Sequence, residues 1–119
     1  VRLLADLDAW VLDEGVEAFQ PSNLEITTVD VANGATNLIP AEARARLNIR
    51  FNPSHTGDGL MAELNRRAGL AQADSGLQIT LEHLCSGEAF LTEPGPFVRA
   101  VQDAVEAETG IRPEASTTG

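Results

Sequence analysis

Three arginines on one side of a single short stretch are the clearest candidates for binding chemistry in this sequence. Residues 43–51 alternate strictly between apolar side chains and Arg44, Arg46, Asn48 and Arg50. Such alternation is typical of a β-strand and would turn the arginines together toward water, a ligand or another chain. A planar guanidinium holds a carboxylate by two parallel hydrogen bonds, so this face could bind anions. The alternative is a solvated face whose ion pairs contribute about 0–1 kcal/mol each.

Asn37 stands just ahead of this strand, next to Ile39 and Pro40. Its amide group can both donate and accept hydrogen bonds. At that place in the sequence it could present the amide to a ligand at the mouth of the arginine face.

Side chains that could hold a transition metal are few. His55, His83 and Cys85 supply the only nitrogen and sulfur ligands, and no HxxxH, HxH or CxxC spacing is present. His83 and Cys85, two residues apart, could share one side of a strand, which leaves a weak site open. A structural role is the more common explanation for both histidines, above all for His55, which falls in an expected turn.

Signals for nucleophilic or phosphate chemistry are absent from the sequence. None of the serines stands in a GxSxG elbow, and Gly57–Gly59 lacks the rest of a phosphate-binding loop. Neither histidine has an orienting carboxylate that the sequence reveals. Asp6, Asp8 and Asp13 fall on the polar side of an expected helix, where solvation is the default. The chain alone is therefore expected to carry no catalytic centre.

Size and charge narrow the class of protein further. A length of 119 residues suits one domain with a single hydrophobic core. The net charge of -10 would repel a phosphate backbone, which argues against nucleic acid as a partner. No apolar run approaches the roughly 20 residues that cross a bilayer, which argues against a membrane partner. The single Cys85 cannot form an internal disulfide and is compatible with a reducing cytoplasm.

Hydrophobic periodicity predicts six elements. They are a helix ending near Gly15, strands over 24–31 and 43–51, a helix capped by Thr56 or Asp58 and closing at Gly69, a strand over 77–84, and a helix from Phe97 to Gly110. Helices and strands in this order favour an α+β two-layer sandwich, with an antiparallel sheet and helices on one face.

Two longer runs resemble a known family. Residues 19–52 contain an NxIP turn followed by an arginine-ended strand, and residues 86–119 contain SGEAFLT and end in TTG. Both runs are similar to the lid and returning segments of the succinyl-diaminopimelate desuccinylases. These enzymes belong with acetylornithine deacetylase and aminoacylase among the co-catalytic metallohydrolases. Residues 53–85 carry little of the resemblance.

The resemblance implies a cytoplasmic bacterial homodimer whose ferredoxin-like lids join at a sheet edge and reach the partner's active site. It implies hydrolysis of N-succinyl-LL-2,6-diaminopimelate, in lysine and diaminopimelate biosynthesis, with two zinc or cobalt ions. Residues 1–86 would form the lid, and residues 87–119 would return to the catalytic domain. Four positions match the family's substrate-binding residues: Asn37, Arg50, Ser86 and Gly87. Thr36 departs from a second asparagine, and Arg44 and Arg46 match no family role.

The family's metal ligands, catalytic glutamate pair and lid histidine have no counterparts here, and its first lid strand would precede Val1. The expectation is therefore an inactive fragment that binds no metal. Two alternatives stay open: a stand-alone α+β module for small-molecule binding or dimerisation, and a related deacetylase or dipeptidase of the same family.

Overall fold

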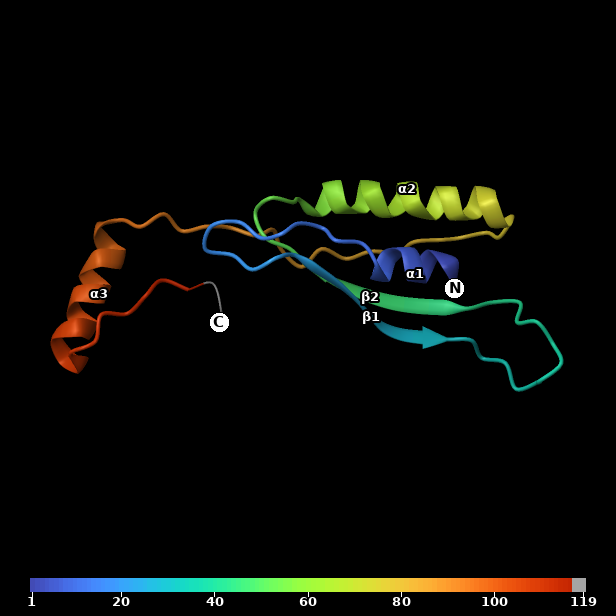
Figure 1. The fold of residues 1–119 in the computed structure, drawn as a ribbon, viewed down its shortest axis with the longest axis horizontal. Helices are drawn as coiled ribbons and strands as arrows, with labels where there is room; N and C mark the ends of the chain where they lie inside the picture. The colour runs from blue at the N-terminus through green and yellow to red at the C-terminus, as the bar shows by residue number, and fades with distance from the viewer. Residues whose placement is uncertain (117–119) are drawn as a thin grey trace.

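The computed structural model describes residues 1–116 of the 119, and the TTG end of the family motif lies outside them. The elements are α1 (Arg2–Asp8), β1 (Asn23–Asp30), β2 (Arg44–Arg50), α2 (Gly57–Ser75) and α3 (Pro96–Thr109). Figure 1 shows α1 and α2 on the same side of the β1–β2 hairpin, while α3 stands apart at the other end of the molecule. The molecule measures 69 × 28 × 22 Å. The expected α+β architecture is confirmed, with a two-stranded antiparallel sheet.

A β-bulge in β1 reconciles two different apolar registers. Leu24 and Ile26 lie at even positions and Val29 at an odd one, so a regular strand would turn Val29 to the opposite face. The pairing shifts between Ile26 and Thr28, where Ile26 pairs with Leu47 and Thr28 with Arg46. At the bulge, two residues of β1 lie opposite one residue of β2, so Val29 returns to the face that carries Ile26.

The predicted alternation of β2 is confirmed. Leu47 and Ile49 are half-buried, whereas Arg46, Asn48 and Arg50 are exposed. One face of the hairpin is therefore directed toward the apolar interior, and the arginine face is open to solvent.

Helix α2 begins where the sequence predicts it and ends later. The hydroxyl of Thr56 accepts a hydrogen bond from the backbone N–H of Gly59 at 3.1 Å, which confirms Thr56 as the cap. The predicted end at Gly69 is wrong, because the helix continues to Ser75 and stops at Gly76 with a φ of 70°. An exposed glycine inside a helix costs only about 1 kcal/mol relative to alanine, and the good helix formers after it prolong the helix.

Helix α1 is shorter than predicted, because it ends at Asp8 rather than near Gly15. The carboxylate of Asp13 accepts a hydrogen bond from the backbone N–H of Gly15 at 2.7 Å. Such a side-chain bond offers the backbone an alternative to helical bonding, so the chain turns here instead of continuing.

The strand predicted over residues 77–84 is not formed. Between Ser75 and Pro96 the described chain contains no strand and no helix. Figure 1 shows this segment running back as an extended trace close to α2. The N–H of Ile79 bonds to the side-chain oxygen of Gln72 at 2.9 Å rather than to a neighbouring strand. An alternating pattern becomes a strand only when a partner strand lies beside it.

The prediction of the last helix is confirmed. Pro96 occupies the first turn of α3, where its missing N–H does no harm, and Gly110 ends the helix with a φ of 72°. No residue of α3 is buried. Among residues 1–116, no helix is long and apolar enough to span a bilayer.

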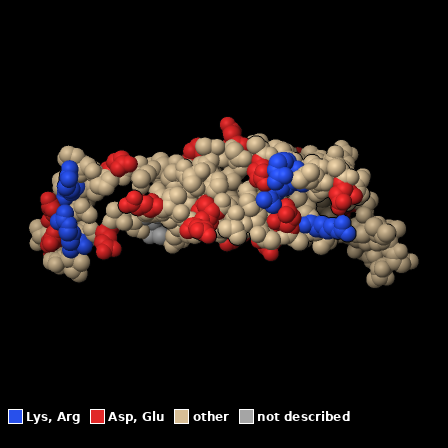
Figure 2. All heavy atoms as spheres, turned by 45° about the horizontal axis from the view of Figure 1, so that its top comes forward, with Lys and Arg blue, Asp and Glu red and all other residues tan. Residues whose placement is uncertain are grey.

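Leu7 of α1 and three residues of α2 form the small core, namely Leu60, Leu64 and Ala68. The interface between α1 and α2 is reinforced by Arg67, which bonds to Asp6 at 2.8 Å and lies 4.5 Å above the ring of Trp10. Figure 2 shows arginines gathered among acidic residues at this interface and again at the α3 end.

Truncation of Leu64 tests the position of this core. Leu64 is 7% exposed and Leu70, on the same helix, is 59% exposed. Leu64→Ala is expected to lower the free energy of unfolding by about 2–5 kcal/mol, because it removes buried methyl groups and leaves a cavity. Leu70→Ala should lower it by less than about 1 kcal/mol. Urea unfolding followed by circular dichroism measures both, and equal losses would contradict the core described here.

Candidate functional site

Arg50 is exposed at the end of β2 and makes no hydrogen bond or ion pair with the chain's own acids within residues 1–116. Arg46 and Arg99 likewise have no ion pair within residues 1–116, whereas each of the other five arginines pairs with an acidic residue: Arg2, Arg44, Arg66, Arg67 and Arg112. In a chain of net charge -10, an arginine without a partner keeps its hydrogen-bonding capacity for another molecule. The geometry is that of a guanidinium available to a carboxylate.

A polar cluster with two buried and two half-buried residues fixes the chain immediately after Arg50. We call this cluster, formed by Asp13, Ser22, Asn52 and His55, the Asp13 corner. The carboxylate of Asp13 accepts bonds from the N–H of Ser22 at 3.1 Å, from Nδ2 of Asn52 at 2.9 Å and from Nε2 of His55 at 2.9 Å. Because an ionised carboxylate can only accept, Nε2 of His55 must carry the proton. Three segments distant in sequence are thereby joined.

Asn52, which is 3% exposed, is bonded through both its backbone and its side chain. Its N–H donates to the hydroxyl of Ser22 at 2.9 Å, and its amide nitrogen also reaches the carbonyl of Gln20 at 3.2 Å. Its side-chain oxygen accepts from the N–H and hydroxyl of Ser54 at 2.9 and 2.6 Å. No buried side-chain nitrogen or oxygen among the described residues lacks a partner, so the end of β2 is rigidly held.

Two sequence interpretations are corrected at this corner. Asp13 was expected to be a solvated helix residue, but its side chain is only 14% exposed and lies beyond the end of α1. His55 was expected to have no orienting carboxylate, and Asp13 supplies one. The expected structural role of His55 agrees with this contact. Asp13 precedes Gly15 by two residues, and Asn52 precedes Ser54 by two. This is the spacing of turns in which an Asp or Asn side chain bonds to the backbone two residues later. It was the signal in the sequence that could have indicated this corner.

The pKa of Asp13 lies below its ordinary value. Burial alone would raise the pKa, but hydrogen bonds from Ser22, Gly15 and Asn52 stabilise the charged form more strongly and lower it. The carboxylate is therefore ionised throughout the physiological pH range.

Ser86 and Gly87 lie at the same end of the hairpin as Arg50. The neighbouring Glu88 accepts two hydrogen bonds from the N–H of Gly57, at 2.9 and 3.1 Å, and Gly57 begins α2 shortly after the Asp13 corner. Ser86 and Gly87 are exposed. The structure thus brings this loop to the end of the hairpin that bears Arg50.

Asn37 lies at the opposite end of the hairpin. A strand advances by about 3.3 Å per residue, so Arg44, where the loop bearing Asn37 joins β2, stands about 20 Å from Arg50. Figure 1 shows that loop projecting away from the point where β2 leads toward α2. The expected meeting of Asn37 and Arg50 at one mouth of the same face does not occur within one copy of the chain.

Possible metal ligands are not gathered. Within residues 1–116, no three side chains of His, Cys, Asp or Glu lie where they could hold a metal ion together. The thiol of Cys85 donates to the carbonyl of Gly87 at 3.3 Å.

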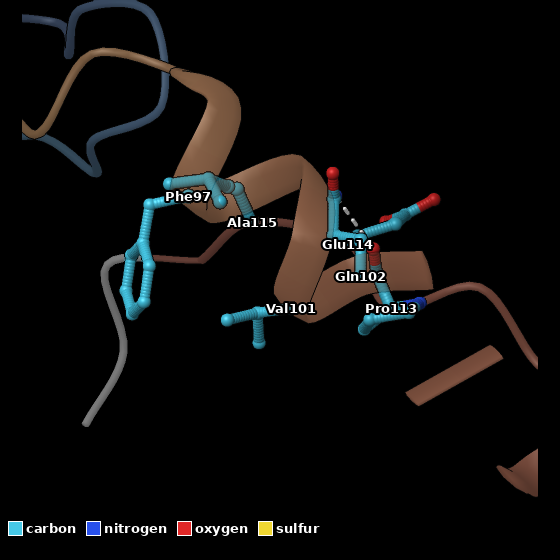
Figure 3. Close-up of a pocket in the computed structure, with 7 residues that line it drawn as sticks. Phe97, Val101, Gln102, Pro113, Glu114 and Ala115 are labelled. Atoms are coloured by element: carbon cyan, nitrogen blue, oxygen red, sulfur yellow. Dashed lines mark hydrogen bonds between the residues drawn. The ribbon is translucent and has the colours of Figure 1, made fainter. Parts of the chain in front are cut away.

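A shallow hollow of about 250 Å³ lies beside α3. Figure 3 shows that Phe97 and Val101 of the helix line it together with Pro113 and Ala115 of the following segment. Gln102 donates to the carbonyl of Pro113 at 3.0 Å and ties this segment to the helix. The lining is mostly apolar. Gln102 and Glu114 are its polar members, and no histidine, serine or cysteine stands among the lining residues.

Comparison with protein families gives one match, to the peptidase dimerisation domain, over residues 1–75. The chain belongs to this family. The matched region of the dimerisation domain contains α1, the hairpin and α2, together with the Asp13 corner.

Curated relatives of this dimerisation domain are named succinyl-diaminopimelate desuccinylase. The chain is 55% identical to the one from Novosphingobium aromaticivorans and 54% identical to the one from Phenylobacterium zucineum, each over 119 residues. It is 54% identical over 121 residues to the one from Caulobacter vibrioides. All of the chain is aligned in each case, and it spans 30–31% of the length of these relatives.

Asp13→Asn tests the corner of the dimerisation domain. It should lower the free energy of unfolding at neutral pH by about 2 kcal/mol, because the new amide group turns a donor toward groups that donate. The neighbouring Glu14 is exposed, so Glu14→Gln is the matched control and should change little. Urea unfolding measures both.

The pH dependence has a definite sign. Because the folded-state pKa of Asp13 is lowered, its stabilisation is complete above the unfolded value of about 4 and is lost as the pH falls further. The stability difference between wild type and Asp13→Asn should therefore shrink below about pH 4. A difference that stays constant or grows on acidification would contradict this role.

Proposed function

We propose that this chain is the lid and dimerisation portion of a succinyl-diaminopimelate desuccinylase. The whole enzyme would hydrolyse N-succinyl-LL-2,6-diaminopimelate to succinate and LL-diaminopimelate in the bacterial cytoplasm, within lysine and diaminopimelate biosynthesis. The observation that carries this proposal is identity of 54–55% along the entire chain to relatives of that name. The free guanidinium of Arg50 supports it, because this substrate is rich in carboxylates.

The division of the chain at residue 86 is part of the proposal. The dimerisation-domain match covers residues 1–75, and α3 stands apart from the hairpin and α2. Large apolar side chains of α3 are exposed, with Phe97 at 80% and Val101 at 46%. Exposed apolar surface of this kind marks an interface, so residues 87–119 would pack on a catalytic domain.

Two zinc or cobalt ions would serve the complete enzyme, where such ions polarise the amide and activate water. The described residues of this chain do not fit a metal site, because they bring no suitable group of ligands together. The metal ligands would therefore come from parts of the complete enzyme that lie outside this chain.

The contribution of this chain would be substrate positioning. Arg50 would hold a substrate carboxylate by paired hydrogen bonds, and the loop of Ser86 and Gly87 would line the same side of the site. The Asp13 corner limits the movement of the chain after Arg50, so binding energy is converted into orientation of the scissile amide.

Asn37 would act in the second copy of a homodimer. Within one copy it stands at the far end of the hairpin from Arg50, beyond the reach of one small dicarboxylate amide. Each strand of the two-stranded sheet has a second edge that pairs with no other described strand. Pairing of sheet edges between two copies would carry the loop of Asn37 toward the partner's active site.

Arg50→Ala in the full-length enzyme should raise the KM for N-succinyl-LL-2,6-diaminopimelate by about 10- to 100-fold, because a charge-assisted bidentate contact is lost. Arg46→Ala on the same exposed face is the matched control and should leave KM close to that of the wild type. Steady-state hydrolysis assays measure both variants. An unchanged KM in Arg50→Ala would remove Arg50 from the substrate site, and wild-type preference for acetylornithine or a dipeptide would change the proposed substrate.

Mixed dimers test the arrangement of Asn37 and Arg50. Asn37→Ala and Arg50→Ala homodimers should each be impaired at both sites. A heterodimer of the two should regain one intact site, because Asn37 comes from one copy and Arg50 from the other. Subunit mixing followed by the hydrolysis assay should therefore raise activity above that of either parent. Activity that stays at the parental level would contradict the assignment.

A further inference from the structure

We propose that Glu88 is a positioning residue for substrate binding, which holds the Ser86–Gly87 loop in register with Arg50 by docking it on the start of α2. This inference rests on the proposed desuccinylase function. Neither the family resemblance nor the free guanidinium of Arg50 gives Glu88 a role, although it belongs to the SGEAFLT run.

The contact between Glu88 and α2 is specific. Its two carboxylate oxygens lie 2.9 and 3.1 Å from the backbone nitrogen of Gly57, the first residue of the helix. The first N–H groups of a helix have no partner inside it, and the positive end of the helix dipole favours a carboxylate there. Thr56 satisfies a different N–H, that of Gly59. Glu88 and Thr56 therefore have complementary roles, and Thr56 cannot replace Glu88.

Glycine at residue 57 leaves room for the side chains of Cys85 and Glu88. A Cβ atom at Gly57 would lie 2.9 Å from Sγ of Cys85 and 2.9 Å from Oε1 of Glu88. Both distances are well below van der Waals contact. Cys85 also donates to the carbonyl of Gly87 at 3.3 Å, so Cys85 and Glu88 hold the segment between them close to Gly57.

The middle of this segment is free for a ligand. Ser86 and Gly87 are exposed, and the hydroxyl of Ser86 has no hydrogen-bond partner among residues 1–116. Contacts at Cys85 and Glu88 flank the free hydroxyl of Ser86. Cys85 and Glu88 thus position the loop and leave the Ser86 hydroxyl available for substrate.

The contact between Glu88 and Gly57 is also connected to Arg50 through the chain. The chain leaves Arg50, is fixed at Asn52 in the Asp13 corner, and continues through a bond from the N–H of His55 to the carbonyl of Asn52 at 3.1 Å. Gly57 follows two residues later. The bond between Gly57 and Glu88 therefore links the chain that follows Arg50 to the segment that contains Gly87. A displacement of about 1 Å at a positioning group can reduce catalytic efficiency by about 100-fold.

The test uses steady-state kinetics of the full-length enzyme with N-succinyl-LL-2,6-diaminopimelate. Glu88→Ala should raise KM by about 10- to 100-fold, with a much smaller change in kcat. Glu88→Gln should stay near the wild type, since its amide oxygen still accepts from Gly57. Glu93→Ala, in the same exposed segment, is the matched control and should leave both constants unchanged. A purely structural loss would lower the active fraction, and so the apparent kcat, without raising KM.

Gly57→Ala supplies an independent variant that retains the carboxylate. Its new methyl group should displace Cys85 and Glu88 and raise KM in the same way, and circular dichroism melting identifies any variant that fails to fold. An active wild type with unchanged KM in the folded Glu88→Ala or Gly57→Ala variant would overturn the positioning role. Equal impairment of Glu88→Gln and Glu88→Ala would overturn it as well. A wild-type enzyme that does not hydrolyse the succinyl amide would instead overturn the proposed function.

Discussion

The half-buried carboxylate of Asp13 is the constraint on which the rest of the structure depends. A charge removed from water must be compensated by hydrogen bonds, and here the donors come from Gly15, Ser22, Asn52 and His55. These donors belong to the segments before β1 and after β2. The requirement to compensate one charge therefore closes the base of the hairpin and fixes the direction in which α2 departs. The hydrophobic core between α1 and α2 is too small to impose that geometry by itself.

This arrangement divides the hairpin into a fixed end and a free end. At the fixed end, Arg50 is followed by the Asp13 corner, and the segment containing Gly87 is held to the first residue of α2 by Glu88. At the free end, residues 31–42 form an exposed loop held by local bonds, such as the one from Asn33 to the carbonyl of Leu38 at 2.8 Å. A rigid base suits the binding of a substrate carboxylate in the same copy. A projecting tip suits contact with a neighbouring molecule, as expected in a family of dimerisation domains.

Sequence reasoning succeeded where a local pattern is sufficient. The alternation in β2, the hydroxyl cap at Thr56 and the glycine after α3 are short-range signals, and the structure confirms them. It failed where the outcome depends on distant residues. Asp13 looks like a helix-surface acid until Asn52 and His55 are placed beside it. Residues 77–84 have the pattern of a strand, yet pattern alone cannot supply the partner strand that a ladder needs.

The bulge in β1 makes the length of that strand as important as its composition. Because two residues oppose one between Ile26 and Thr28, Asp30 faces Arg44 and Val29 faces Ala45. Without the bulge, the same number of residues in a regular ladder would turn Val29 to the face of the arginines. Adding one further residue here would have the same effect unless a second extra residue were bulged out, so insertions should be tolerated less well than substitutions.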